Sequence, residues 1–227
     1  MRSMRGIVLA AALLTACTSQ APFATPASTT QAPTTTAPTT TSTQPVAEQM
    51  PKWVEQAAIP RDGMADYGFA APTEQEYRSD WMLMPCMVVP PALESYTNSL
   101  HRKWAGDRVD LRHTVVAFEK FTGVQFIEQL KAETASCTDW EYDNGQRYDM
   151  RLDVPVREPE GLQGVEAFYG FCVDTVEETG PARRCVAFLA RGNVVSSLYV
   201  IQRTEPLTAS LDKLYELLPR AVQHLTT

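Results

Sequence analysis

A run of 30 uncharged residues near the N-terminus, positions 18–47, limits most strongly what this chain can fold into. The run consists almost entirely of Thr, Pro, Ala, Ser and Gln, and five of its residues are prolines. Such a composition cannot bury enough apolar surface to offset the entropy lost on ordering the chain, so it predicts a disordered, extended stalk. In a polyproline II conformation the stalk would reach at most about 90 Å, at about 3.1 Å per residue. Thr/Pro-rich stalks are also typical substrates of O-glycosylation.

The residues before the stalk have the pattern of an export signal. Two arginines among the first five residues precede an apolar run at positions 6–14, which is far shorter than the roughly 20 residues that span a bilayer. The run ends in Leu-Thr-Ala-Cys at positions 14–17, which resembles the lipobox of bacterial lipoproteins. That resemblance implies cleavage after Ala16 and attachment of lipid to Cys17. The lipid would be a diacylglycerol group on the thiol, and an acyl chain such as palmitate could be added to the new amine. Two or three acyl chains make such an anchor stable. An ordinary secretory signal with an incidental cysteine is the alternative interpretation.

The remaining residues, 48–227, contain Trp, charge pairs and periodic apolar positions, and they are enough for one domain with a real core. We therefore divide the chain into a signal peptide at 1–16, a lipidated Cys17 with its stalk at 17–47, and a single domain at 48–227. The chain has 20 basic and 27 acidic residues, and loss of the two signal-peptide arginines changes the net charge from −7 to −9. An acidic chain gains nothing from phosphate attraction, so nucleic acid is not an expected partner.

Helices and strands are both predicted in the first half of the domain. Capping-box patterns predict the starts of two helices, one over 73–83 and one from 123 to about Cys137. Between them, the spacing of apolar residues predicts a third helix over 90–106, opened by two prolines and closed by a glycine. The alternating pattern that follows predicts a strand over 109–119.

The second half of the domain has the pattern of β-structure followed by one helix. Asn144-Gly145 is a strong hairpin signal, and further strands are predicted over 148–156, 165–175, 183–191 and 193–203. Apolar residues over 207–225 predict a terminal amphipathic helix, which Pro219 must kink or divide. The whole pattern predicts an α+β domain with an antiparallel sheet of about four to five strands. Two to four helices are expected to pack on one face of this sheet.

Four cysteines remain once Cys17 is lipidated, and an even number in an exported chain predicts two disulfides. If the strands around Cys172 and Cys185 form a hairpin, its centre falls between residues 178 and 179, and the two cysteines lie opposite one another. Cys86 would then pair with Cys137. The sequence alone allows three pairings, and free catalytic thiols are a further alternative. No two of these cysteines lie within four residues of each other, which is unlike a zinc site.

The sequence from Val115 onward resembles a known family. Val-Val-Ala-Phe-Glu leads into a helix with an apolar stripe that ends at Cys137 and is followed by Trp140, and the segment 184–200 precedes the terminal helix. These patterns resemble the extracellular sensor domain of mycobacterial Ser/Thr receptor kinase H and related actinobacterial sensor-domain lipoproteins. The resemblance extends over about 110 residues.

This resemblance implies an α+β domain with a cleft, two disulfides and ligand sensing outside the cell. It also implies that Cys137 pairs with Cys185 and that Cys86 pairs with Cys172, in conflict with the hairpin pairing. The chain contains neither a kinase domain nor a transmembrane helix in its sequence pattern. Whatever it senses therefore cannot be passed directly to the cytoplasm.

Motifs of catalysis are absent from the sequence. Nucleophile-elbow, zinc-protease, Walker and dinucleotide motifs do not occur, and the histidines at 101, 113 and 224 lack the spacing of metal ligands. The carboxylates at 139, 141 and 143 match a calcium loop only weakly, and solvated loops are the alternative. The cluster of Met82, Met84, Cys86 and Met87 has soft sulfur ligands suited to copper(I), with core packing as the alternative.

Aromatic residues of the predicted sheet offer one candidate ligand surface. They could line an apolar groove or simply form the core of the sheet, and they are Phe168, Tyr169, Phe171, Phe188 and Tyr199. The sequence does not choose between these interpretations, so the ligand-binding residues stay unknown at this level.

Together these patterns predict a membrane-anchored, extracytoplasmic lipoprotein whose domain binds a ligand or acts as a sensor. We expect no catalysis, no metal and no cofactor. The expected partners are membrane lipid, through acylated Cys17, and an unknown small molecule or envelope protein. The alternative is a cell-wall protein-interaction or envelope-biogenesis factor without a small-molecule ligand. A concave apolar pocket of about 300 Å³ or more with a few polar groups at its rim favours the first hypothesis. A large exposed apolar patch favours the alternative.

Overall fold

The computed structural model describes residues 45–72, 82–95, 97–106, 108–142, 145–151, 153–178, 180–203 and 206–227. The predicted signal peptide, Cys17 and the stalk up to residue 44 lie outside the described residues, as does most of the helix predicted over 73–83. Helix α1 begins at Val46, two residues before the expected domain boundary. Within the described part of the chain, no helix is both long enough and apolar enough to cross a membrane.

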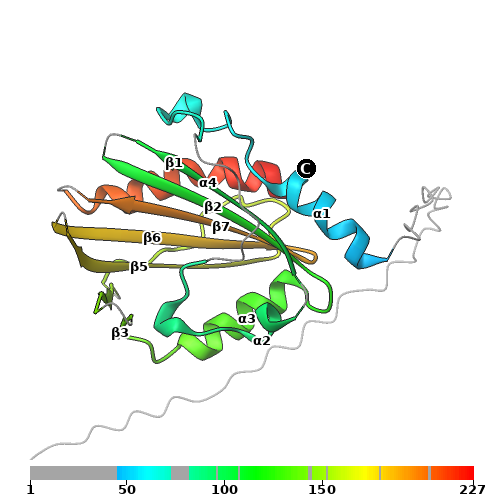
Figure 1. The fold of residues 1–227 in the computed structure, drawn as a ribbon, viewed down its shortest axis with the longest axis horizontal. Helices are drawn as coiled ribbons and strands as arrows, with labels where there is room; N and C mark the ends of the chain where they lie inside the picture. Colours follow the sequence, from blue (N-terminus) through cyan, green and yellow to red (C-terminus); the bar gives the residue numbers. More distant parts are fainter. Residues whose placement is uncertain are drawn as a thin grey trace, which may run out of the picture. The chain divides into compact units, whose positions relative to one another are not determined.

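Seven antiparallel strands form one sheet in the order β1-β2-β7-β6-β5-β4-β3 (Figure 1). The strands are β1 (Thr97–Ala105), β2 (Val109–Phe118), β3 (Asp139–Glu141), β4 (Arg147–Met150), β5 (Ala167–Glu177), β6 (Gly180–Arg191) and β7 (Val194–Gln202). The helices are α1 (Val46–Ala57), α2 (Pro91–Glu94), α3 (Gly123–Thr134) and α4 (Ala209–Thr226), with short 3₁₀ turns η1 (Ala65–Tyr67) and η2 (Pro85–Met87). The predicted α+β class is confirmed, and the sheet has more strands than the four to five expected.

Helices cover both faces of this sheet, so the expectation that all of them pack on one face is wrong. Helices α1 and α4 pack against β1, β2, β6 and β7, and α3 packs against β5 and β6. The alternation along β6 shows that these are opposite faces. Ala187 and Leu189 belong to the core beneath α4, and Val186 and Phe188 belong to the core beneath α3. All nine residues of β7 are buried, as expected for a strand that is covered on both faces.

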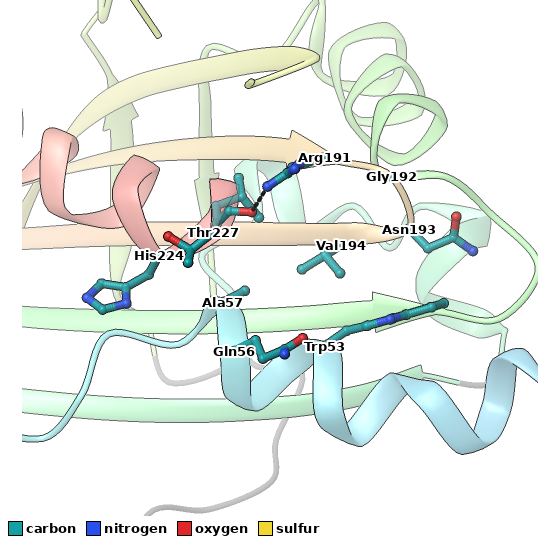
Figure 2. Close-up of a pocket in the computed structure, with 10 residues that line it drawn as sticks. Trp53, Gln56, Ala57, Arg191, Gly192, Asn193, Val194, His224 and Thr227 are labelled. Carbon is teal, nitrogen blue, oxygen red and sulfur yellow. Dashed lines mark hydrogen bonds between the residues drawn. The ribbon is translucent and has the colours of Figure 1, made fainter. Parts of the chain in front are cut away.

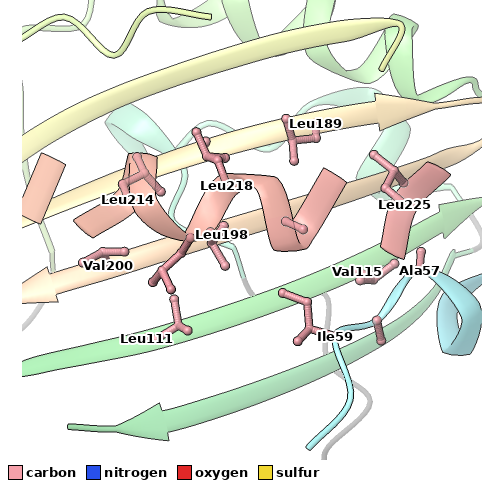
Figure 3. Packing of buried hydrophobic residues seen from close by; sticks show 14 of the residues in the cluster. Ala57, Ile59, Leu111, Val115, Leu189, Leu198, Val200, Leu214, Leu218 and Leu225 are labelled. Carbon is pink, nitrogen blue, oxygen red and sulfur yellow. The ribbon is translucent and has the colours of Figure 1, made fainter. Parts of the chain in front are cut away.

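The larger core lies between the sheet and the pair α1 and α4 (Figure 3). Leucines of α4 pack on aliphatic side chains of β2, β6 and β7, and the segment after α1 closes one side. The labelled residues of this core are Ala57, Ile59, Leu111, Val115, Leu189, Leu198, Val200, Leu214, Leu218 and Leu225. The terminal amphipathic helix is thereby confirmed. It continues through Pro219 as a single helix, so the proline does not divide it.

The segment 97–105 forms strand β1 and not the helix predicted over 90–106. Only Pro91–Glu94 is helical, and the chain then pairs antiparallel with β2 along its whole length. The misleading signal was the spacing of Leu100 and Trp104. Residues four apart share one side of a helix, but they also share one face of a strand because four is a multiple of the strand period of two. Both side chains are buried in the core beneath α1 and α4.

The local signals for α3 and for the first hairpin are confirmed. The hydroxyl of Thr122 accepts a hydrogen bond from the backbone N–H of Gln125 at 3.2 Å, and the side-chain oxygen of Gln125 accepts one from the backbone N–H of Thr122 at 2.8 Å. This is a complete capping box. Strands β3 and β4 form the hairpin predicted around residues 144 and 145. β4 ends at Met150, however, so the strand predicted over 148–156 is shorter than expected.

Two disulfides, Cys86–Cys137 and Cys172–Cys185, join the four cysteines. The register of β5 and β6 places Cys172 directly opposite Cys185, with their Cα atoms 4.1 Å apart. This is the pairing that the hairpin centre between residues 178 and 179 predicts. The pairing implied by the family resemblance is therefore wrong, and none of the four cysteines is a free thiol. From sequence separations of 51 and 13 residues, the two bonds stabilise the domain by about 4 and about 3 kcal/mol respectively in the chain-entropy model.

Candidate functional site

A cavity of about 390 Å³ opens where the turn between β6 and β7 lies beside the ends of α1 and α4 (Figure 2). Its apolar lining consists of Trp53, Ala57, Val194 and Leu225. Its polar lining consists of Gln56, Arg191, Gly192, Asn193, His224 and Thr227. The volume falls within the range of about 300–1,000 Å³ that is typical of small-molecule sites. The cavity is therefore the concave pocket with a polar rim that the ligand-binding hypothesis requires.

The β6–β7 turn that forms one wall is held in place from three directions. The backbone N–H of Gly123, at the start of α3, donates to the carbonyl of Gly192 at 2.7 Å. The side-chain amide of Asn193 donates to the carbonyl of Phe118 at 3.1 Å, and the N–H of Phe118 donates back to the carbonyl of Asn193 at 2.9 Å. The carboxylate of Glu166 accepts from the N–H of Gly192 at 2.9 Å. The wall is thus fixed before any ligand arrives.

Glycine is required at the centre of this turn and at its contact with α3. Gly192 has a φ of +54°, in the left-handed region that residues other than glycine rarely adopt. At Gly123 a Cβ atom would lie 2.6 Å from the carbonyl oxygen of Val194 and 2.9 Å from the Cβ of Ala190. The close approach of α3 to the turn therefore depends on the missing side chain.

Arg191 supplies the positive charge of the cavity. Its Nη1 donates to the backbone carbonyl of Leu225 at 3.2 Å, which ties the end of β6 to the end of α4 (Figure 2). Among the residues that the structure describes, Arg191 has no carboxylate partner. A guanidinium has five N–H groups, so this arginine retains donors for a ligand after it has bound the carbonyl.

His224 lines the cavity at the end opposite Asn193 (Figure 2). Burial lowers the pKa of His224, and the nearby charges of Arg220 and Arg102 lower it further. The imidazole is consequently neutral at neutral pH. Its Nε2 is buried and finds no hydrogen-bond partner in the described part of the chain.

Beneath this end of the cavity, a second histidine anchors the segment that follows α1. His113 accepts a hydrogen bond at Nδ1 from the N–H of Ile59 at 3.4 Å, so its Nε2 carries the proton and donates to the hydroxyl of Ser196 at 2.8 Å. Burial lowers the pKa of His113 to about 3, helped by the charge of Arg102. The guanidinium of Arg102 also donates to the carbonyl of Ile59. Both backbone groups of Ile59 are thus satisfied by buried side chains of the sheet.

The lining of the cavity can bind a molecule but holds no pair of nucleophile and base. Among the described residues its lining includes no carboxylate side chain and no thiol. The hydroxyl of Thr227 donates to the carbonyl of Gln223 at 2.7 Å. The neutral imidazole of His224 has no acid beside it to orient it, which general-base catalysis normally uses.

The candidate metal sites named from the sequence do not assemble. In the described residues no group of three or more His, Cys, Asp or Glu side chains could hold a metal ion. Asp139 pairs with Arg147 at 2.7 Å, and residue 143 lies outside the described residues. Met82 and Met84 are buried in the core beneath α3, and Cys86 is oxidised in a disulfide. The interpretation as core packing therefore holds for Met82 and Met84, whereas Met87 is exposed.

The aromatic residues of the sheet pack in its cores and line none of the cavities described here. Phe168 lies in the core beneath α4, and Phe171, Phe188 and Tyr199 lie in the core beneath α3. Tyr169 packs against the same α3 core, and its hydroxyl lies 3.0 Å from the hydroxyl of Thr134. The core interpretation is confirmed for this set.

A second cavity, of about 550 Å³, lies at the opposite end of β6 and β7 and is lined mainly by charged residues. Glu177 accepts hydrogen bonds from Arg184 at 2.5 Å and from Arg203 at 2.8 Å. Arg203 also donates to Asp110 at 2.5 Å. Two guanidiniums and two carboxylates therefore neutralise one another inside the domain.

A third cavity, of about 420 Å³, runs between α4 and the segment 159–162. Its lining is largely apolar and includes Leu218, Pro219 and Val222. Its polar side chains are Glu160, Tyr215 and Gln223. The hydroxyl of Tyr215 already accepts from the N–H of Arg157 at 2.8 Å. Of the three, only the cavity beside the β6–β7 turn combines apolar side chains with an arginine, Arg191, that has no carboxylate partner among the described residues.

The sequence predicted the turn at residues 192 and 193 but not that it forms a site. The lining comes from three segments, 53–57, 191–194 and 224–227, that are distant in sequence. No motif joins such segments, since only the order of the strands brings them together. The one local signal was Trp53, a large aromatic residue at the start of the domain that is only partly buried.

No protein-family model matches this sequence, and no curated protein is similar to it. The structure is similar to the extracellular domain of PknH from Mycobacterium tuberculosis, with 14% identity and a TM-score of 0.45, over 81% of this chain and 98% of that chain. It is also similar to the Rv0999 ortholog from Mycobacterium smegmatis, with 12% identity and a TM-score of 0.34, over 58% of this chain and 65% of that chain. The first likeness involves the sensor domain that the sequence patterns resemble. Identities and TM-scores this low say nothing about what the cavity of this chain binds.

Proposed function

We propose that residues 46–227 form a non-catalytic ligand-binding domain and that the cavity beside the β6–β7 turn is its binding site. One observation carries this proposal. A cavity of about 390 Å³ joins four apolar side chains to a rim of polar groups that includes Arg191, on a wall fixed by the turn, and its described lining lacks an acidic side chain or thiol. Binding sites for small molecules have this mixture of apolar lining and few convergent polar groups.

The same proposal places the domain outside the cytoplasm, tethered through Cys17. Two disulfides support an oxidising compartment, because thiols stay reduced in the cytosol of most organisms. The lipobox pattern at 14–17 supports acylation of Cys17, and the uncharged segment 18–47 supports a stalk between the membrane and the domain. The domain would then meet its ligand at the cell envelope.

Native mass spectrometry of the protein purified from the membranes of its own host tests ligand binding. We expect a small molecule to remain bound to the wild type and to be lost from Gln56→Trp. Gln56 lines the cavity but is exposed on α1, so an indole there fills the cavity without entering the core. Lys52→Trp is the matched control, because Lys52 is exposed one turn earlier on the same helix and does not line the cavity. The same occupancy in both variants would contradict the proposed site.

Detergent-phase partitioning tests the anchor. The wild type should partition into the detergent phase as a mature-sized species. Cys17→Ala should be released into the medium or remain an unprocessed precursor, because it lacks the thiol to which the lipid attaches. A mature-sized Cys17→Ala protein in the detergent phase would exclude anchoring through Cys17 and leave the binding site unaffected.

The alternative function, a protein-interaction factor, has less support. Its surface would consist of exposed apolar side chains, and the large ones in the described residues are Met87, Val89 and Val176. Val176 lies on the β5–β6 hairpin, and the other two lie in the segment before α2. Single exposed apolar residues are ordinary on soluble proteins and do not define an interface.

A further inference from the structure

We infer that the cavity beside the β6–β7 turn takes an amphipathic anion, a molecule with an apolar body and one carboxylate or phosphate head. This inference rests on the proposed function and adds the chemical class of the ligand. It depends on three properties of the cavity: the charge of its lining, the arrangement of its apolar residues, and its size.

Among the described residues that line the cavity, Arg191 is the one charged side chain. Arg191 has only the carbonyl of Leu225 as its partner in the described residues, and the lining includes no acidic side chain. Two carboxylates beside the residues that line the cavity already have partners. Glu166 accepts from the N–H of Gly192 at 2.9 Å, and Glu55 lies 3.8 Å from Arg102. A charge-assisted hydrogen bond to an anion is therefore available to Arg191 without displacing an internal ion pair.

The charged groups near His224, at the other end of the cavity, are also cationic. Arg220 donates to the carbonyl of Gly63 at 3.1 Å and to the side chain of Gln223 at 2.9 Å, and so is partnered by neutral oxygens. Its charge, with that of Arg102, contributes to the lowered pKa of His224, after burial. A cationic ligand would meet this field unfavourably at both ends, whereas an anion is favoured.

The apolar residues provide a surface for the body of the ligand. The indole of Trp53 comes from α1, Ala57 lies one turn further along the same helix, and Val194 faces them from β7 (Figure 2). Leu225 of α4 completes the apolar lining. A volume of about 390 Å³ equals that of about 13 water molecules at about 30 Å³ each. This suits a short, single-chain body with one head group and excludes a two-chain lipid held entirely within the cavity.

A probe series with one tail and four heads tests the inference: decanoate, decyl phosphate, decanol and decyltrimethylammonium, each below its micelle concentration. Calorimetric titrations use the full chain with Cys17→Ala, so that acylation and detergent do not interfere. We expect decanoate or decyl phosphate to bind one per chain, at least tenfold more tightly than decanol, with no saturable binding of the cation. The tighter of the two anions identifies the head as a fatty-acid type or a phosphate type.

Variants then assign the head group to Arg191. Arg191→Gln should weaken the binding of the anions at least tenfold and leave decanol unchanged, and Arg191→Lys should recover part of the loss. Arg157→Gln is the matched control, because Arg157 is exposed and does not line this cavity. Gln56→Trp should abolish binding of every probe. Arg191 and Gln56 are both exposed, so neither substitution enters the core.

Three outcomes would overturn the inference. Equal affinity for decanol and for both anions, or an Arg191→Gln protein that binds the anions as the wild type does, would contradict an anionic ligand while leaving the proposed site in place. If no probe saturates, the ligand class is wrong. The proposed function is tested independently by native mass spectrometry. It fails only if Gln56→Trp and Lys52→Trp retain the same co-purified molecule to the same extent.

Discussion

The two ends of strands β6 and β7 both carry arginines, and the difference lies in what those arginines contact. At the end formed by β6's first residues, Arg184 and Arg203 share Glu177, and Arg203 reaches Asp110 as well. At the turn end, Arg191 contacts a single backbone carbonyl. An arginine paired inside the protein stabilises the fold, whereas an arginine with spare donors at a cavity is available to a ligand. The cavity of larger volume is therefore not the better candidate site.

The electrostatics of Glu177 support this distinction. Burial of Glu177 opposes its charge, but hydrogen bonds from Arg203 and Arg184 outweigh burial and lower its pKa overall. Its side chain is only 15% exposed, and that of Arg184 is 12% exposed. The charges at this end are thus committed to each other in a partly desolvated environment, where losing one partner is costly.

The largest expected effect is that of Glu177→Gln. Removal of this carboxylate leaves Arg184 without its carboxylate partner and Arg203 with Asp110 alone, which should lower the free energy of unfolding by about 3 kcal/mol. Urea denaturation at neutral pH measures the change. Glu178→Gln, on the neighbouring residue of the same hairpin, is the control and should change the stability by less than about 0.5 kcal/mol. Equal effects of the two substitutions would mean that the charge network does not stabilise the fold.

A smaller loss is expected from Gly123→Ala, which acts at the turn end. The new Cβ would lie 2.6 Å from the carbonyl oxygen of Val194, so α3 or the turn must move, at a cost of about 2 kcal/mol for overpacking. Because Arg191 and Asn193 flank this turn, the variant should also bind the anionic probes more weakly. Glu128→Ala, on an exposed position of α3, should change neither quantity. A Gly123→Ala protein with unchanged stability and binding would show that the turn is not fixed through α3.

The two ends should also respond to acid in different pH ranges. Burial lowers the pKa of His113 to about 3 from an ordinary value of 6.5. The unfolded chain therefore binds this proton before the folded protein does, and stability is lost as pH falls from 6.5 towards 3. One such group gives at most about 1.4 kcal/mol per pH unit. Glu177 has a lowered pKa relative to 4.5, so its stabilising contribution is lost only below about that pH.

Substitutions separate these two ranges. His113→Gln should reduce the slope of stability against pH between 6.5 and 5, leaving the shares of His101, whose pKa burial lowers to about 4, and of His224, whose pKa is also lowered by burial. Glu177→Gln should leave that slope unchanged and alter only the loss at lower pH. Urea midpoints at half-unit pH intervals provide the measurement. A His113→Gln protein that keeps the full slope would show that other groups carry it.

The contrast between the two ends explains which features could be predicted from the sequence. Signals that depend on neighbouring residues succeeded: the capping box at Thr122, and the Cys172–Cys185 bond, which follows from the centre of a single hairpin. Leu100 and Trp104 misled because a spacing of four residues fits a helix and a strand equally. That error removed one strand from the predicted sheet.

The cavity proposed as the binding site could not be predicted for a different physical reason. Trp53, Arg191 and His224 are brought together only by the strand order of the sheet and by the packing of α1 and α4 on one of its faces. Nothing in the sequence around Arg191 distinguishes it from Arg184 or Arg203. The distinction consists of the partners that the folded protein provides, a carbonyl in one case and carboxylates in the others.

The smallest expected effect on stability provides the most direct test of that distinction, because one chemical change can be made at both ends. Arg191→Gln removes an exposed charge and one hydrogen bond to a carbonyl, so it should change the free energy of unfolding by less than about 0.5 kcal/mol. Arg203→Gln removes contacts to two carboxylates and should cost about 1–2 kcal/mol. Binding of the anionic probes should show the reverse order, with a loss for Arg191→Gln and none for Arg203→Gln. If Arg191→Gln proved the more destabilising of the two, Arg191 would be a structural residue, and the positive charge of the cavity would belong to the fold and not to a ligand.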